Sequence, residues 1–157
     1  MGWADPVIGP LRTAGLSLVT AESCTGGLIA AILSHGKGAG DCLHGGFVVH
    51  TKANKAKVLG VDRALLDRQG AVNAEVARQM AEGALERSTA SVALSVTGVL
   101  GPDADPDGNP VGLLYFAIAR AGTATEVWRR EFANMQPDEV RRAAALHALE
   151  TMYGNLR

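Results

Sequence analysis

The sequence predicts an α/β protein, a three-layer α/β/α sandwich with a mixed, mostly parallel sheet. Helix-like and strand-like segments alternate through the first two thirds of the chain, which is typical of parallel strands joined by helices. Two strand-like segments then flank the short turn RAGTA, which indicates an antiparallel hairpin. The chain has 157 residues, of which 47% are hydrophobic, so it can bury a sizeable core and we expect a single domain over residues 1–157.

Glycines mark the expected ends of the helices in the first half of the chain, because glycine readily adopts the left-handed conformation that ends a helix. The runs LSLVT and FVVHT are short and apolar, as expected of buried strands. The expected elements are a helix over about 6–14 ended by Gly15, a strand over 16–20, a helix ending near Gly36, a glycine-rich loop over 35–46, a strand over 47–51, a helix from Lys52 that stops at Gly60, and the short helical piece DRALLDRQG.

The second half of the chain carries clear helix-start signals. Asn73 is a good N-cap for a helix with apolar spacing, and Pro137 suits the first turn of a final helix. The expected elements are the helix AEVARQMAEGALERS, a strand over 91–97, a turn-rich loop over 98–110, hairpin strands VGLLYFAIA and TEVWRREF, and a last helix to about Tyr153.

Composition excludes several classes of function. The formal net charge is −1 and no run of lysine or arginine exceeds a pair, so nucleic acid is not an expected partner. No apolar stretch is long enough to cross a bilayer, and the start of the chain lacks signal-peptide features. We therefore expect a cytoplasmic protein with no membrane partner. Cys24 and Cys42 are expected to be reduced, and without clustered histidines they predict no metal site.

Ligands in open α/β sheets gather beyond the carboxyl ends of strands, so the loops after Thr20, Thr51 and Thr97 are the candidates. The first loop contains TAESCTGG, a polar cluster between an apolar strand and an apolar helix. Its Ser23 could cap the helix, or it could be a nucleophile whose reaction oxyanion meets the free amides of the helix start.

Two neighbours of that serine leave further alternatives open. Cys24 is a rival nucleophile, because a helix start lowers a thiol pKa, although free cysteine is more often a buried hydrophobe. Glu22 could act as an acid or base, or it could simply complement the helix dipole.

The second loop leads into a helix with Lys52, Lys55 and Lys57. Such a run is usually a solvated face, but a lysine desolvated in a cleft loses its proton and can serve as a general base. His50, just before it, is either structural or a proton-transfer group.

The third loop contains Asp103, Asp105, Asp107 and Gly108, which match the opening of a calcium-binding loop. The bidentate glutamate needed at the twelfth position is Leu114, so a solvated turn is the preferred interpretation. No Walker lysine follows, which excludes a P-loop. The pairs expected to form a backbone cradle for a ligand are Thr97-Gly98 and Gly101-Pro102.

Four segments together resemble the CinA C-terminal domain family, in the order in which they occur there: TAESCTGG, GGFVVHTKANKAKVLGV, GAVNAEVARQMAEGA, and SVTGVLGP with NPVG. The similarity runs from about Gly15 to Tyr153. It implies a three-layer α/β/α fold and, for members acting alone, nicotinamide-nucleotide amidase activity. That reaction hydrolyses the carboxamide of nicotinamide mononucleotide to nicotinate mononucleotide and ammonia, without a metal or redox cofactor. The family also implies a small-molecule nucleotide as partner and a homo-oligomer.

The resemblance also implies site residues. The serine of ESCTGG falls on Ser23 and the lysine of a segment usually like YSNEAK falls on Lys55, which implies a Ser–Lys dyad. The backbone of Thr25, Gly26 and Gly27 is the candidate oxyanion site. The expected substrate-binding residues are Glu22, Gly46, Thr51, Thr97, Gly98, Gly101 and Pro102.

The chain departs from the family pattern at two places. The tyrosine before SNEAK is His50 here, and the arginine of a segment usually reading GDR falls on Pro137. Arg141 and Arg142 are the candidates to supply the missing positive charge. Two alternatives therefore stand beside the amidase: a catalytically weak or inactive nucleotide-binding paralogue, and an amidase acting on a different substrate.

Overall fold

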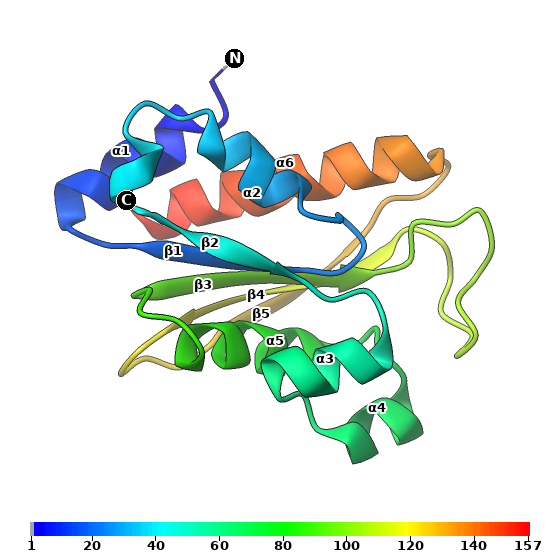
Figure 1. Cartoon of the computed structure of the whole chain (residues 1–157). Helices are drawn as coiled ribbons and strands as arrows, with labels where there is room; N and C mark the ends of the chain where they lie inside the picture. Colours follow the sequence, from blue (N-terminus) through cyan, green and yellow to red (C-terminus); the bar gives the residue numbers. More distant parts are fainter. Residues whose placement is uncertain (1) are drawn as a thin grey trace.

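A five-stranded sheet forms the middle layer of this computed structural model, which describes residues 2–157 (Figure 1). The strand order is β2-β1-β3-β4-β5. β1 pairs in parallel with β2 and β3, whereas β4 is antiparallel to both β3 and β5, so four of the five strands run in one direction. The strands are β1 Leu18–Glu22, β2 Leu43–Val48, β3 Val92–Gly98, β4 Leu113–Arg120 and β5 Glu126–Glu131. The predicted α/β fold with a mixed, mostly parallel sheet is confirmed.

Helices cover both faces of this sheet (Figure 1). One face carries α1 Asp5–Ala14, α2 Leu28–Ser34 and α6 Pro137–Asn155, and the other carries α3 Lys52–Leu59, α4 Arg63–Gln69 and α5 Ala74–Glu86. A 3-10 turn, Ala39–Asp41, leads into β2. Each face of the sheet has its own hydrophobic core, one around Leu94 and Phe116 and the other around Ala93 and Met80. Side chains alternate between the faces of a strand, so neighbours along β3 contribute to different cores.

The predicted helix signals are confirmed in the structure. The α5 helix begins where the Asn73 side chain accepts a hydrogen bond of 2.9 Å from the amide of Val76. Gly15 and Gly60 adopt left-handed conformations that end α1 and α3. These local rules therefore locate the helices within a residue or two.

Two strands, β1 and β2, differ from their predicted bounds by two residues or more at both ends. β1 runs to Glu22 instead of ending at Thr20, because the carboxylate of Glu22 finds buried hydrogen-bond donors and can remain in the sheet. β2 begins at Leu43 and ends at Val48, four residues before its predicted start and three before its predicted end. β2 is an edge strand with alternating exposure and two glycines, so no continuous apolar run reveals it.

One close helix crossing fixes the position of α3. Gly83 of α5 faces the end of α3, and a Cβ atom at this position would lie 1.9 Å from the carbonyl oxygen of Leu59. Glycine is therefore required there for the two backbones to approach. This contact holds α3 against α5 beneath the edge of the sheet where β1, β2 and β3 end.

Candidate active site

Three loops meet at one edge of the sheet because β1, β2 and β3 are parallel and end side by side. Glu22 of β1 lies opposite Val48 of β2 and Val96 of β3. The ladder continues past the strand ends, since the amide of Ser23 donates to the carbonyl of Val96 at 3.1 Å and the amide of Val49 donates to the carbonyl of Glu22 at 2.9 Å. The loops predicted to carry the site therefore lie together.

Ser23 and Lys55 are in direct contact at this edge. Lys55 Nζ and Ser23 Oγ are joined by a hydrogen bond of 2.8 Å. Ser23 is 6% exposed and Lys55 only 1% exposed, so this contact is shielded from solvent. The structure thus brings together two residues that lie 32 positions apart in the sequence.

Burial shifts the protonation equilibrium of Lys55 toward the neutral form. Nζ also donates to the carbonyl oxygens of Val49 at 3.1 Å and His50 at 3.4 Å, and no carboxylate pairs with it within residues 2–157. Burial lowers the pKa of Lys55 from its usual 10.5 to about 8. A lysine in this state can accept a proton near neutral pH.

Glu22 lies beneath the serine and not in the cleft. Its side chain is fully buried, and its carboxylate accepts hydrogen bonds from Thr25 Oγ1 at 2.7 Å, Ile29 N at 2.9 Å, Ala30 N at 3.0 Å and Thr20 Oγ1 at 3.2 Å. Two of these donors are the amides of the first turn of α2. All these contacts are internal, so the structure gives no support to the prediction that Glu22 binds substrate. The helix-cap alternative for Ser23 is wrong, since Glu22 takes that role.

Cys24 is a poor nucleophile in this setting. Its side chain is 6% exposed, and burial raises the pKa of its thiol to about 12, although the nearby charge of Lys55 opposes this effect. The thiol therefore stays protonated at neutral pH, and Ser23 is the stronger candidate.

The turn that follows Ser23 presents backbone amides. Gly26 and Gly27 adopt positive φ angles of 62° and 98°, which glycine tolerates best. The Gly26 amide donates to the carbonyl of Ser23 at 3.1 Å, whereas the amides of Cys24, Thr25 and Gly27 donate to no other residue within residues 2–157. Gly26 is thus engaged in the turn, and the neighbouring amides are the better candidates to stabilise an oxyanion.

A cleft in two connected parts opens above this pair. The larger hollow has a volume of about 660 Å³ and the smaller one about 420 Å³, and both are lined by Ser23, His50, Gly98 and Asp105. These volumes lie within the usual range of small-molecule sites. The larger hollow adds Thr51, Lys52, Lys55, Arg63, Asp67, Thr97 and Asp107, and the smaller one adds Cys24, Gly26, Gly101, Asp103 and Arg141.

The substitutions relative to the family pattern lie around this cleft. His50 lines both hollows, so it can contact a bound molecule. Arg141 lines the smaller hollow, where its guanidinium is 3.0 Å from the Asp138 carboxylate. Arg142 is exposed and does not line either hollow, so it is not placed to replace the missing arginine. Pro137 begins α6 and has no charge to contribute.

Other predicted contacts divide into two groups. Thr97 and Gly98 line the cleft, but the Thr97 hydroxyl is occupied by a 2.8 Å hydrogen bond to the carbonyl of Ala71. Thr51 caps α3 through a hydrogen bond of 3.0 Å from the amide of Asn54. Gly46 and Pro102 do not line either hollow, and a Cβ at Gly46 would instead meet Thr20 Oγ1 at 2.5 Å. The prediction that Gly46 and Pro102 contact a ligand finds no support.

The aspartate-rich β3–β4 loop, residues 99–112, folds as a hydrogen-bonded turn. Asp105 accepts hydrogen bonds from the amides of Asp107 and Asn109, at 3.1 and 2.7 Å. In the part of the chain that the structure describes, no group of three or more histidine, cysteine or acidic side chains is placed to hold a metal ion. Sequence reasoning underrated Asp105 and Asp107 as cleft residues, because a turn pattern does not reveal which wall the turn forms.

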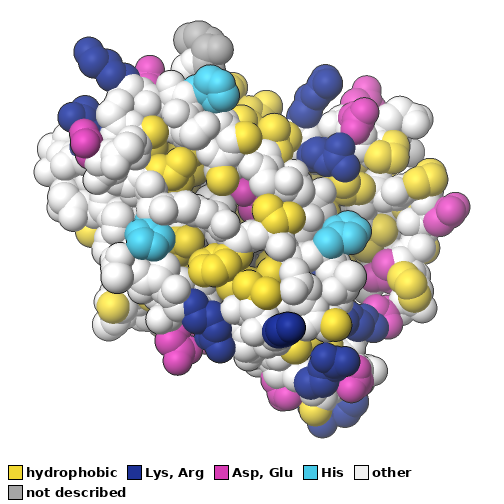
Figure 2. Space-filling model, in the orientation of Figure 1, with side chains coloured by type: hydrophobic (Ala, Val, Ile, Leu, Met, Phe, Trp, Pro, Cys, Tyr) yellow, Lys and Arg dark blue, Asp and Glu magenta, His cyan; other side chains and the backbone are white. Residues whose placement is uncertain are grey.

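The surface carries mixed charge. On the face shown in Figure 2, lysine and arginine side chains lie among aspartate and glutamate side chains, with hydrophobic side chains gathered near the middle. None of the helices in residues 2–157 combines the length and apolar character needed to cross a membrane.

Known proteins resemble this chain in sequence and in fold. The CinA C-terminal domain family matches residues 3–156. The nicotinamide-nucleotide amidohydrolase PncC of Escherichia coli (strain K12) is 38% identical over 143 residues, which cover 91% of this chain and 86% of that protein. A CinA-like protein of Chlorobium luteolum is 48% identical over 116 residues, covering 74% of this chain. The chain spans only 27% of that longer relative.

Solved structures agree with these sequence matches. The competence/damage inducible protein CihA from Agrobacterium tumefaciens has a TM-score of 0.92 and 37% identity, covering 97% of this chain and 92% of that one. A CinA superfamily protein from Escherichia coli has a TM-score of 0.91 and 35% identity, covering 96% and 86%. The sequence match over nearly the whole chain, the shared fold and the meeting of the TAESCTGG and HTKANK segments at one cleft lead to one conclusion: this chain belongs to the CinA C-terminal domain family.

Proposed function

We propose that the chain is an amidohydrolase that deamidates nicotinamide mononucleotide to nicotinate mononucleotide and ammonia through a Ser23–Lys55 dyad. The observation that carries the proposal is the buried 2.8 Å hydrogen bond between Ser23 Oγ and Lys55 Nζ in the cleft. The similarity to PncC, whose name describes a nicotinamide-nucleotide amidohydrolase, supports the substrate class.

The reaction begins with proton transfer from Ser23 to neutral Lys55. The Ser23 oxygen then attacks the carboxamide carbon and forms a tetrahedral intermediate with a negatively charged oxygen. Lys55 is suited to this role because burial lowers its pKa to about 8, which leaves a useful neutral fraction at physiological pH.

The amides that follow Ser23 stabilise the intermediate. Those of Cys24, Thr25 and Gly27 have no other hydrogen-bond partner within residues 2–157, so they can donate to the oxyanion. Protonated Lys55 next gives its proton to the amide nitrogen, the carbon–nitrogen bond breaks, and ammonia leaves. Ser23 then holds the nicotinoyl group as an ester.

Water completes the cycle. Lys55, neutral again, takes a proton from a water molecule, which attacks the ester carbonyl. The bond to Ser23 Oγ breaks, the serine regains its proton from Lys55, and the carboxylate product leaves. The first step uses two groups that are already within hydrogen-bond distance of each other.

Ammonia release from purified protein and nicotinamide mononucleotide tests this function. We expect Ser23→Ala to abolish release and Cys24→Ala to retain it, with exposed Ser34→Ala as the matched control. Activity that persists in the Ser23→Ala protein, or that is lost in Cys24→Ala at unchanged stability, contradicts the proposed nucleophile.

A catalytically weak or inactive nucleotide-binding protein is the second candidate. Pro137 removes the arginine of the family pattern, and Arg141, which lines the cleft, is engaged by Asp138. This alternative expects nucleotide binding by calorimetry without ammonia release, so turnover of a pyridine nucleotide excludes it.

A third candidate is an amidase for a different substrate. His50 lines both parts of the cleft, where the family pattern has tyrosine, and an imidazole there changes the shape and polarity of the site. A panel of nucleotide amides separates this candidate from the first, since another amide would then be hydrolysed faster than nicotinamide mononucleotide.

A further inference from the structure

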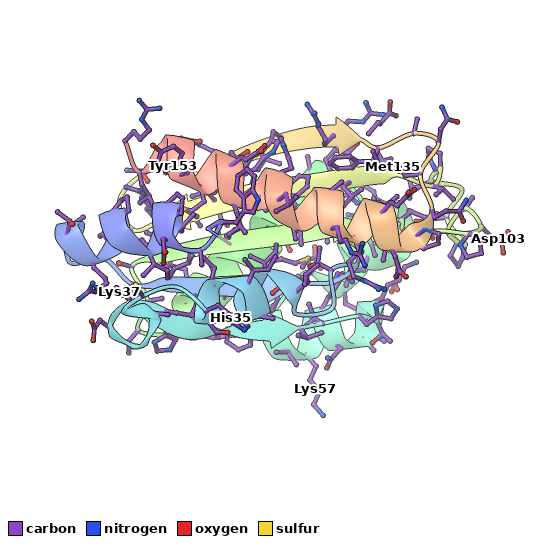
Figure 3. The ribbon with its side chains drawn as sticks, turned by 90° about the horizontal axis from the view of Figure 1, so that it is seen from above. His35, Lys37, Lys57, Asp103, Met135 and Tyr153 are labelled. Carbon is purple, nitrogen blue, oxygen red and sulfur yellow. The ribbon has the colours of Figure 1, made fainter. Side chains whose placement is uncertain are left out.

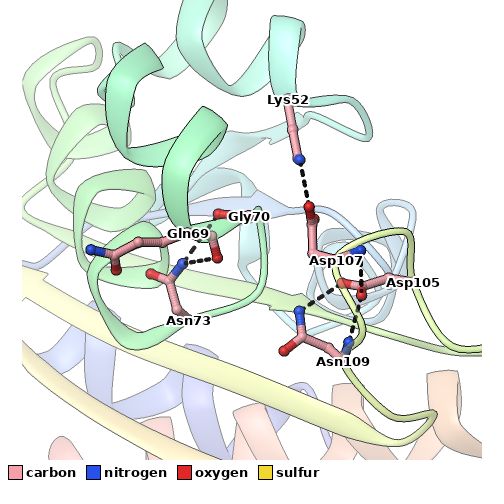
Figure 4. A network of polar contacts seen from close by, with 7 residues as sticks. All are labelled: Lys52, Gln69, Gly70, Asn73, Asp105, Asp107 and Asn109. Atoms are coloured by element: carbon pink, nitrogen blue, oxygen red, sulfur yellow. Dashed lines mark hydrogen bonds and ion pairs between the residues drawn. The ribbon is translucent and has the colours of Figure 1, made fainter.

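An ion pair joins the two walls of the larger hollow. Lys52 Nζ, from the start of α3, lies 3.0 Å from Asp107 Oδ1 of the β3–β4 loop (Figure 4). Both residues line the hollow that contains Ser23 and Lys55. Their side chains are 37% and 28% exposed, so the pair lies at the outer part of the cleft and not on its floor.

The loop does not need this ion pair to keep its shape. Asp105 holds the turn by accepting from the amides of Asp107 and Asn109, and from Asn109 Nδ2 at 2.8 Å (Figure 4). These bonds involve the Asp107 backbone but not its carboxylate. The carboxylate can therefore leave Lys52 while the turn stays folded.

Lys52 also lines the same hollow as the Ser23–Lys55 pair. It lies three residues before Lys55 on α3, which places the two on one side of the helix and about 4.5 Å apart along its axis. Lys55 reaches inward to Ser23, whereas Lys52 reaches outward to Asp107. A substrate with its amide at Ser23 can extend along the larger hollow toward Lys52, because both residues line that hollow.

The charges at that outer end favour a single anionic group once Asp107 moves aside. Arg63 lines the same hollow and makes no ion pair within residues 2–157. Asp67 lines it too, and Asp105 is committed to its three internal hydrogen bonds. Two cations would then face one uncommitted carboxylate.

We propose that Lys52 selects phosphorylated substrates by exchanging the Asp107 carboxylate for the substrate's phosphate. This inference rests on the proposed amidase, whose nucleotide substrate carries a phosphate at the end remote from the amide. A carboxylate and a phosphate both accept charge-assisted hydrogen bonds from an ammonium group, so one can replace the other. In the free protein Lys52 forms an ion pair with Asp107, and in the complex it forms one with the phosphate of the substrate.

The test compares nicotinamide mononucleotide with nicotinamide riboside, its phosphate-free counterpart, in four proteins: wild type, Lys52→Gln, Asp107→Asn and the control Lys57→Gln. Lys57 lies on the same helix but its side chain extends into solvent (Figure 3). We expect Lys52→Gln to raise the KM for the nucleotide about tenfold, the size of one charge-assisted hydrogen bond. The KM for the riboside should not change.

The Asp107→Asn substitution should change the KM for the nucleotide in the opposite direction. Removing the competing carboxylate should lower the KM for the nucleotide and leave the riboside unaffected. The inference is overturned if Lys52→Gln raises the KM for both substrates equally, or for neither. It is also overturned if Asp107→Asn raises the KM for the nucleotide. Equal loss of both substrates in Lys52→Gln, or weaker nucleotide binding in Asp107→Asn, would indicate that the ion pair only stabilises the fold of the cleft.

The same experiment distinguishes failure of the proposed amidase activity from failure of the inference about Lys52. If wild type releases no ammonia from either compound, the proposed function fails, and calorimetry with nicotinamide mononucleotide in the same four proteins still decides the role of Lys52. Weaker binding in Lys52→Gln alone supports the phosphate exchange. Equal binding in all four proteins, or none in wild type, overturns it.

Discussion

Replacing Lys55 with methionine should stabilise the protein in a pH-dependent way while abolishing catalysis. Lys55 is almost fully buried and its pKa is lowered by burial from 10.5 to about 8. Between these two values the unfolded chain binds more protons than the folded one, so the stability of the wild type rises as the pH increases through this window. Below pH 8 the full cost of burying the charge is present, about 3 kcal/mol for this shift.

Methionine has a similar length and no charge, so it removes this cost. Proton linkage with the two pKa values makes the cost about 3 kcal/mol at pH 7 and about 2 kcal/mol at pH 9. The gap in unfolding free energy between Lys55→Met and wild type should therefore shrink by about 1 kcal/mol from pH 7 to pH 9. Other groups titrate in both proteins, so the difference isolates Lys55.

Urea denaturation of both proteins at the two pH values measures this gap. The rate should follow the same group, because kcat/KM of the wild type requires neutral Lys55 and should rise with pH to a plateau above about pH 8. The lowered pKa makes the neutral fraction at pH 7 about 300 times larger than an ordinary lysine would have. A gap that stays constant between pH 7 and pH 9 would refute the reasoning about the charge of Lys55.

Two further substitutions probe how the site is held. Glu22→Gln keeps the shape of the side chain but replaces one buried acceptor by a donor that faces the first turn of α2. We expect the free energy of unfolding in urea denaturation to fall by about 3 kcal/mol. A fall below about 0.5 kcal/mol would match an ordinary surface change and contradict the capping role. Gly83→Ala places a methyl group against the Leu59 carbonyl and should cost about 2 kcal/mol and lower kcat by moving α3. The helical control Gly154→Ala, with open space around it, should be neutral or slightly stabilising, and equal effects at both glycines would argue against the close helix crossing.

The elements that depend on local chemistry could be predicted from the sequence, and those that depend on tertiary partners could not. Asn73 and Gly60 act through hydrogen bonds within a few residues, so their helices were correctly placed. β1 extends to Glu22 because distant amides of α2 satisfy its carboxylate, and no local pattern contains that information. The predicted bounds of β2 are wrong because this edge strand has no continuous apolar run.

The candidate site shows the same division. Spacing alone favoured a solvated face for Lys55, and only the family resemblance indicated a partner for Ser23. The contact between them depends on the pairing of β1 with β2 and on the packing of α3 against α5. Likewise, the ion pair between Lys52 and Asp107 joins residues 55 positions apart, and it requires knowledge of where the β3–β4 loop lies.

The walls of the cleft come from separate parts of the chain. Residues 18–59 supply β1, β2, α2 and α3, and with them both Ser23 and Lys55. The β3–β4 loop and the start of α6 contribute Asp107 and Arg141 from the remainder of the chain. Because the β3–β4 loop carries neither Ser23 nor Lys55, mutations in this loop can accumulate without moving the serine from its lysine. Such an arrangement lets a lineage change the molecule that it binds while the Ser23–Lys55 pair is retained.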